Sequence, residues 1–197
     1  LSLGVIGDAV PVGICGSGLV DAVYALHRVG IIDDSGRFVS DDIAADVAPM
    51  LADRLITRDS GDRVFVLHTD DGEPTVFLSQ RDVRELQFAK AAIATGWTLL
   101  AEEFGVQDSE IQQVLLAGSF GSYLSPASAV KIGLVPKISV LRIVSAGNVA
   151  GEGAKMALLS TQERHGAATL LDEIKYVELS DREDFNDKFV ERLAFPA

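Results

Sequence analysis

The sequence predicts an α/β fold, and two observations support this prediction. Helical patterns alternate along the chain with short apolar runs of strand length. Two of these runs, residues 114–117 and 139–144, lead into glycines and then into a helical pattern. A strand that ends in a glycine turn before a helix is how α/β proteins bring backbone N–H groups up to a nucleotide or another anion. We therefore expect the turn at Gly118 and Gly121 to be the nucleotide end of the molecule.

Length and composition are those of an ordinary globular domain. The chain has 197 residues, 48% apolar and 23% charged, so we expect one domain, residues 1–197, with a real core. No apolar run approaches the roughly 18 residues of a membrane span, and no signal peptide is recognisable. The chain starts at Leu1 without methionine, so we expect it to be a piece of a longer protein.

The charge balance limits the partners. The formal net charge is −12, from 29 acidic and 17 basic residues. Nucleic acid and anionic membranes both require clustered Lys and Arg, so neither is expected as a partner. A nucleotide remains possible, because backbone amides and helix N-termini bind phosphate without net positive charge.

The single cysteine, Cys15, limits the metal sites that this chain can form and indicates the redox conditions of its cellular compartment. It excludes an internal disulfide framework and fits a reducing cytoplasm. It also excludes an iron–sulfur cluster or a cysteine zinc site held by this chain alone, and no His, Asp or Glu grouping has metal-ligand spacing. Its place before a helix start favours a thiolate, but a buried and inert thiol is the interpretation we prefer.

The first part of the chain is expected to hold a strand, a helix and a hairpin. Residues 1–12 are apolar and predict the last strand of a sheet that begins upstream. A helix follows, with Ser17 as its N-cap and Gly30 just after its last turn. Residues 64–67 and 75–78 predict a hairpin, with a loop longer than a two-residue turn.

The longest helix is expected to begin after Ser79. Ser79 and Asp82 fit a capping box. Apolar residues then repeat at helical spacing for roughly six turns, until Gly105; they are Leu86, Ala89, Ile93, Trp97, Leu100 and Phe104. Gln87 and Lys90 share another face, which is either a solvated edge or a place from which both residues reach a ribose or base.

After the first glycine turn, Ser125 and Pro126 predict the N-cap and first residue of a helix that Gly133 closes. The second strand, residues 139–144, leads to a helix with Asn148 as a plausible N-cap. The C-terminal expectations are a helix, a strand and an amphipathic helix, at residues 167–174, 176–179 and 183–194.

Three glycine-rich segments, residues 15–18, 117–121 and 147–153, each lie at a helix start or close before one. Either they converge on one nucleotide, or they are the tight turns that any α/β domain needs. None is a Walker A loop, and no G-x-G-x-x-G follows a strand, which disfavours a P-loop enzyme and a Rossmann dehydrogenase.

The second glycine segment allows a rival interpretation. It is one residue away from the G-x-S-x-G nucleophile elbow, so Ser119 could be the nucleophile of a hydrolase. Only Glu152 and His165 could complete the triad in the required order. The elbow also needs a helix directly after the serine, whereas Ser125 and Pro126 predict a delayed helix. The hydrolase interpretation is therefore disfavoured.

Four segments together resemble one known family, and they run in the same order through nearly the whole chain. They are residues 11–21, 84–90, 116–124 and 147–154. They look like the C-terminal region of the reductive activators of corrinoid proteins, and Phe195-Pro196 fits the ending of that family.

The resemblance implies the second half of an actin-like, ribonuclease H-like ATPase fold, with a mixed sheet flanked by helices and a β-hairpin insertion. It implies a cytoplasmic, homodimeric activator that uses ATP with Mg²⁺ to reduce the Co(II) corrinoid of a methyltransferase system to Co(I). The partner is then a corrinoid protein. Family members carry a 2Fe–2S ferredoxin domain upstream. This sequence lacks its cysteines and the Asp-x-Gly-Thr phosphate loops of the fold, so no catalytic residue is assigned and the fragment alone is expected to be inactive.

The resemblance also implies a set of nucleotide-binding positions. Residues 118–121 look like the adenosine loop, and residues 148–153 resemble the last connecting helix of the fold. The expected nucleotide-binding residues are Gly16, Ser17, Gly18, Gln87, Lys90, Gly118, Ser119, Phe120, Gly121, Asn148 and Gly151. The alternative is an interaction module, which dimerises or grips the corrinoid protein through an open sheet edge without a nucleotide site of its own.

Overall fold

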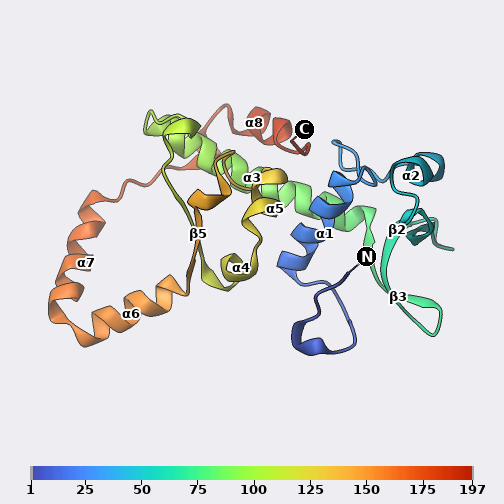
Figure 1. The fold of residues 1–197 in the computed structure, drawn as a ribbon. Coiled ribbons are helices and arrows are strands. Elements are labelled where there is room, and N and C mark those ends of the chain that lie inside the picture. Colours follow the sequence, from blue (N-terminus) through green and yellow to red (C-terminus); the bar gives the residue numbers. More distant parts are fainter. Residues whose placement is uncertain (1, 197) are drawn as a thin grey trace.

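Figure 1 shows the computed structural model of the chain, in which residues 2–196 are described. The helices and strands are α1 (Gly16–Arg28), α2 (Asp41–Val47), β1 (Leu55–Thr57), β2 (Arg63–Asp70), β3 (Glu73–Ser79), α3 (Gln80–Glu103), β4 (Val114–Ala117), α4 (Gly118–Tyr123), α5 (Pro126–Lys131), β5 (Ile143–Gly147), α6 (Val149–Leu159), α7 (Thr161–Glu173) and α8 (Phe185–Glu191). None of these helices is long and apolar enough to cross a membrane.

The α/β class is confirmed, and the strands form two small sheets. Strands β1, β2 and β3 make an antiparallel sheet, and β4 and β5 make a parallel pair. The long helix α3 runs through the middle of the molecule, with α1 and the hairpin toward one end and α8 alongside the other (Figure 1). The main core gathers apolar side chains from α1, α3, α5 and the antiparallel sheet.

The N-terminal expectations are partly wrong. Residues 2–12 form no strand, and only a 3-10 turn spans Ile6–Asp8, because Gly7 and Asp8 both have positive φ and break the extended run. Cys15, not Ser17, is the N-cap of α1. Gly30, with φ of +79°, follows the helix as predicted, in a Schellman motif.

The hairpin is confirmed, but its turn is tighter than expected. Asp70 pairs with Glu73, so Asp71 and Gly72 are the only turn residues. Both have positive φ, +48° and +85°, which is the backbone of a type I′ turn. The prediction of a longer loop was wrong because both strands continue past their apolar runs into polar residues.

Helix α3 begins as predicted but buries a different face. Ser79 accepts a hydrogen bond from the backbone of Asp82, and the Asp82 carboxylate accepts one from the Ser79 N–H, which completes the capping box. Ile93 and Phe104 of the predicted stripe are 52% and 69% exposed. The buried residues are Val83, Leu86, Gln87, Lys90, Ala91, Ala94, Thr95 and Leu99.

Gln87 and Lys90 are each only 2% exposed, so a solvated edge is the wrong interpretation. Gln87 Nε2 donates to the carbonyl of Leu193 at 2.8 Å, and Lys90 Nζ donates to the carbonyl of Ala194. Desolvation, followed by repulsion from Arg192, lowers the pKa of Lys90 to about 8. These two side chains therefore hold the C-terminal segment against α3.

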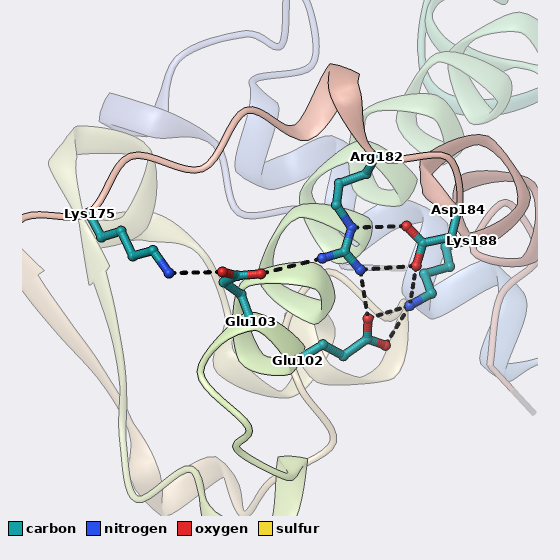
Figure 2. A network of polar contacts seen from close by, with 6 residues as sticks. All are labelled: Glu102, Glu103, Lys175, Arg182, Asp184 and Lys188. Atoms are coloured by element: carbon teal, nitrogen blue, oxygen red, sulfur yellow. Dashed lines mark hydrogen bonds and ion pairs between the residues drawn. The ribbon is translucent and has the colours of Figure 1, made fainter.

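A polar network ties the C-terminal region to the other end of α3 (Figure 2). Its members are Glu102, Glu103, Lys175, Arg182, Asp184 and Lys188. Glu102 and Glu103 occupy the last turn of α3, where a carboxylate faces the negative end of the helix dipole. Their partners Lys175, Arg182 and Lys188 neutralise that charge.

The last quarter of the chain departs most from expectation. Residues 176–179 form no strand, because no strand of the described chain runs beside them. Helix α7 starts earlier than predicted, and α8 is shorter. Helices α6 and α7 bury no residue and extend away from the remainder of the structure (Figure 1).

Candidate functional site

The parallel strands β4 and β5 end at one edge. Leu116 pairs with Ser145, and Ala117 pairs with Gly147. The residue at each turn is a glycine with left-handed backbone: φ is +85° at Gly118 and +65° at Gly147. A side chain would strain the backbone at both positions. The two chain segments therefore turn side by side toward α4 and α6.

The second strand lies later than predicted. It spans Ile143–Gly147 rather than residues 139–144. The Ser139 hydroxyl accepts a hydrogen bond from the backbone of Leu141 and caps a 3-10 turn at Val140–Arg142. This local hydrogen bond competes with extended structure, and it moves the strand start toward the glycines.

Helix α4 begins directly at Gly118, so the prediction of a delayed helix was wrong. Leu124 is extended and separates α4 from α5. The predicted cap of α5 is confirmed, because Ser125 Oγ accepts from the Ser128 N–H at 3.3 Å and Pro126 is the first helical residue. The N-cap of α4 is Ala117, which has no capping side chain. The first N–H groups of α4 are thus without a side-chain cap.

Gly121 lets α4 lie directly on β4. A Cβ at this position would be 2.7 Å from the carbonyl carbon of Leu116 and 2.9 Å from its oxygen. Both atoms belong to the backbone, so they cannot swing aside. Gly118, in contrast, has no other atom within 4 Å of a Cβ position, so the space in front of the turn is open.

The first glycine segment meets the second through Gly16 and Phe120. A Cβ on Gly16 would be 3.0 Å from Cε2 of the Phe120 ring. Phe120 is nevertheless 48% exposed, so part of its ring faces solvent beside the open turn. Behind this contact, Ser128 Oγ donates to the carboxylate of Asp21 at 2.6 Å and joins α5 to α1.

The third glycine segment adjoins the second through the pairing of Ala117 with Gly147. Asn148 is the N-cap of α6, as predicted, and its Oδ1 accepts from the Gly151 N–H at 3.1 Å. A Cβ on Gly151 would be 2.6 Å from Asn148 Nδ2, so the glycine makes room for the cap. All three glycine segments, defined above by their residue numbers, thus form one edge, which we call the glycine edge.

Cys15 lies at the glycine edge and is exposed, which contradicts a buried thiol. Hydrogen bonds from the Ser17 hydroxyl, at 3.5 Å, and from the Gly18 N–H, at 3.4 Å, lower the pKa of the thiol. Ser17 therefore forms a hydrogen bond with Cys15, the N-cap of α1, and is not itself the N-cap.

Two of the expected nucleotide-binding residues lie elsewhere. The Gln87 side chain donates hydrogen bonds to the carbonyls of Ser35 and Leu193, and the Lys90 side chain donates one to the carbonyl of Ala194. None of these carbonyls belongs to a glycine segment. Gly36 lies against the Gln87 amide, which leaves that side chain little room to turn away.

No histidine or carboxylate among residues 2–196 is hydrogen-bonded to the Ser119 hydroxyl as a general base would be. Glu152 is paired with Lys155 at 2.6 Å, and within residues 2–196 no hydrogen bond joins Ser119 to Glu152 or His165. The early start of α4 gives the turn an elbow-like shape, but the chemistry of a triad is missing. No group of three or more His, Cys, Asp or Glu in this range could hold a metal ion.

Comparisons with known proteins agree on one family. A family model described as the C-terminal domain of RACo, the ASKHA domain, matches residues 1–197. The chain is 41% identical over 166 residues to the corrinoid activation enzyme RamQ of Eubacterium limosum, over 83% of this chain and 28% of the relative. A solved structure of a reductive activator for corrinoid, iron–sulfur protein matches with a TM-score of 0.81 and 33% identity, over 97% of this chain and 30% of that one. The chain spans less than a third of the length of each of these two relatives. The expected ATPase fold is confirmed by the family model and by the structural match.

Proposed function

The chain belongs to the family defined by the C-terminal ASKHA domain of RACo, and on that premise we propose that it is the adenosine-binding part of a reductive activator of corrinoid proteins. The whole protein would use ATP, with Mg²⁺, to drive electron transfer to a Co(II) corrinoid and return it to Co(I). The electron would pass from an iron–sulfur cluster that lies outside this chain. We propose that the protein acts in the cytoplasm on the corrinoid protein of a methyltransferase system.

The convergence of the three glycine segments is the observation that carries this proposal. Gly118 turns with open space in front of it, and α4 follows without a capping side chain. Phe120 presents the exposed part of its ring at the same place. Backbone N–H groups beside an aromatic ring suit a ribose and a planar base. The residues present therefore fit an adenosine.

In the mechanism, this chain binds and orients, and it supplies no assigned catalytic group. The N–H groups of Gly118 and Ser119 would bond the nucleotide, while the ring of Phe120 would cover one face of the base. Asn148 keeps the start of α6 in place beside them. Nucleotide-linked closure of two lobes would then regulate docking of the corrinoid protein. ATP supplies the free energy for an otherwise unfavourable reduction.

A second candidate function is an interaction module. Helices α6 and α7 bury no residue, and Leu158, Leu159 and Leu171 are 77%, 85% and 70% exposed. Apolar side chains exposed in a row favour contact with another protein surface. In this function helices α6 and α7 would mediate homodimerisation or bind the corrinoid protein, and the domain would have no nucleotide site of its own.

Titration of the intact protein with ATP in a calorimeter separates the two functions. Gly118→Ala places a Cβ on a left-handed residue, at a strain of about 1–2 kcal/mol. Backbone movement that relieves this strain would turn the N–H groups of residues 118 and 119 away from the nucleotide, so we expect about tenfold weaker ATP binding. Gly166→Ala is the matched control, since Gly166 has open space on α7 and ordinary helical backbone. Unchanged ATP affinity in Gly118→Ala would leave the interaction module as the function.

A further inference from the structure

A cavity of about 740 Å³ lies away from the glycine edge, where α1 ends. Helix α1 starts at Gly16 on the glycine edge and reaches the cavity at Arg28, about 20 Å along its axis for 13 residues. The other walls come from the turn after α1, the end of α5 and the residues after it, Trp97 of α3, Asp108 and the C-terminal segment. Its volume is within the range of small-molecule sites. No residue of the glycine segments lines it.

Four cationic side chains line this cavity: Arg28, Lys131, Lys137 and Arg192. None of the four has an ion pair with a carboxylate within residues 2–196. This is unusual in a chain whose formal net charge is −12. Arg28, Lys131 and Arg192 lie at helix C-termini, which favours a cation at each position but does not explain why all face one cavity.

The carboxylates of the cavity compensate these charges only in part. Asp34 is hydrogen-bonded to His27 Nε2 at 3.0 Å. Asp33 accepts from the Ser35 hydroxyl at 2.7 Å and from the Arg37 N–H at 2.9 Å. Asp108 is the third carboxylate of the lining. The lining therefore carries four Lys and Arg side chains against three carboxylates, and none of the three is ion-paired with Lys131 or Lys137.

An aromatic ring lines the cavity, and further positive charge lies close to it. Trp97 is fixed by a hydrogen bond from Nε1 to the carbonyl of Leu134, and the Arg192 guanidinium lies 5.3 Å from its ring centre. Buried Lys90 lies 3.8 Å from a Cβ position on Gly133, which also lines the cavity. Desolvation, followed by repulsion from Arg192, lowers the pKa of Lys90, and a bound anion would relieve the repulsion.

We propose that this cavity binds a small molecule with two or more phosphate or carboxylate groups, whose anionic groups contact Lys131, Lys137 and Arg192 and whose apolar part lies on Trp97. The site is separate from the glycine edge and does not depend on nucleotide binding there. It gives the domain a second ligand, which approaches from the side of the C-terminal segment.

The test uses the intact protein with pyrophosphate and citrate as probes and the fluorescence of Trp97 as the readout. Trp97 is the single tryptophan of this chain, and Trp97→Phe identifies its part of the signal. We expect a saturable change with at least one probe, and at least tenfold weaker binding in the double variant Lys131→Ala/Lys137→Ala, about the value of one charged hydrogen bond. Lys155→Ala is the matched control, because Lys155 is an exposed lysine on α6.

Both probes are needed to assign the ligand. A response to pyrophosphate alone assigns phosphate groups, a response to citrate alone assigns carboxylate groups, and either supports the site. Gly118→Ala should leave both responses unchanged, so this test and the ATP titration can fail separately. The absence of a saturable response at millimolar concentrations overturns the proposal, as does a response that ATP displaces or that survives the double variant.

Discussion

Gly16 lies against the aromatic ring of Phe120, with 3.0 Å between a Cβ position on the glycine and Cε2 of the ring. The two residues come from different glycine segments, residues 15–18 and residues 117–121, which lie far apart in the sequence. Their contact places the start of α1 beside the start of α4. This contact, with the pairing of Ala117 and Gly147, builds the glycine edge.

The first prediction concerns this contact. Gly16→Ala should push the Phe120 ring outward by a few tenths of an ångström and weaken ATP binding by the intact protein severalfold. Stability should change little, because a helix prefers alanine to glycine, by up to about 1 kcal/mol in its interior and by less at a first residue such as Gly16, and this preference offsets part of the strain. ATP calorimetry and urea unfolding measure both effects. Gly166→Ala, on α7 with open space around it, is the control and should leave ATP binding unchanged.

Gly121→Ala tests the packing of α4 on β4. The new Cβ would be 2.7 Å from a backbone atom of Leu116, so the backbone of the helix or the strand must move. We expect a loss of about 1–3 kcal/mol in the free energy of unfolding, the usual cost of overpacking. Urea unfolding measures it, with Gly166→Ala as the control. A Gly121→Ala variant as stable as wild type would show that α4 is not held against β4.

Buried Lys90 predicts a pH dependence. Its pKa is about 8 in the folded state and 10.5 in the unfolded chain, so the unfolded state binds more protons between these values. Stability should therefore rise with pH from about 8 to 10.5 relative to a Lys90→Met variant, by an amount on the order of 3 kcal/mol at most. Urea unfolding of both proteins at several pH values measures the difference. Parallel profiles would contradict a charged, buried Lys90.

The polar network of Figure 2 predicts an acid- and salt-sensitive C-terminal segment. A hydrogen bond from Lys175 lowers the pKa of Glu103, and bonds from Arg182 and Lys188 lower that of Asp184. Their stabilisation is thus complete above the unfolded-state pKa values, near 4, and is lost as the pH falls through the lowered values.

Amide hydrogen exchange in α8 measures this attachment. Arg182→Ala should speed exchange in residues 185–191, and high salt should speed it in wild type because these charges are partly exposed to solvent. Lys155→Ala removes an ion pair of α6 and should not affect α8. Equal exchange of α8 in wild type and Arg182→Ala would show that the network does not hold this helix.

Local signals in the sequence predicted local structure well. The capping box of Ser79 and Asp82, the Schellman turn at Gly30 and the start of α5 at Ser125 each depend on residues within one helical turn. The strand and the glycine turn at Gly118 were likewise predicted, but the helix was expected only after Ser125, whereas α4 begins at Gly118 itself. These features need no knowledge of distant parts of the chain.

Features that depend on distant segments could not be predicted. Gln87 and Lys90 look like surface residues, and only the carbonyls of Leu193 and Ala194, far along the chain, explain their burial. Ile93 and Phe104 are apolar but face away from the core. In the same way, no spacing rule indicates that Gly16 meets Phe120.

Photolabelling of the intact protein with an azidoadenine analogue of ATP shows directly whether the adenosine binds at the glycine edge. We expect a crosslink within residues 118–123, the segment that carries Phe120, and its loss when excess ATP competes. Crosslinks that are displaced by ATP yet lie outside all three glycine segments would contradict an adenosine site at the glycine edge.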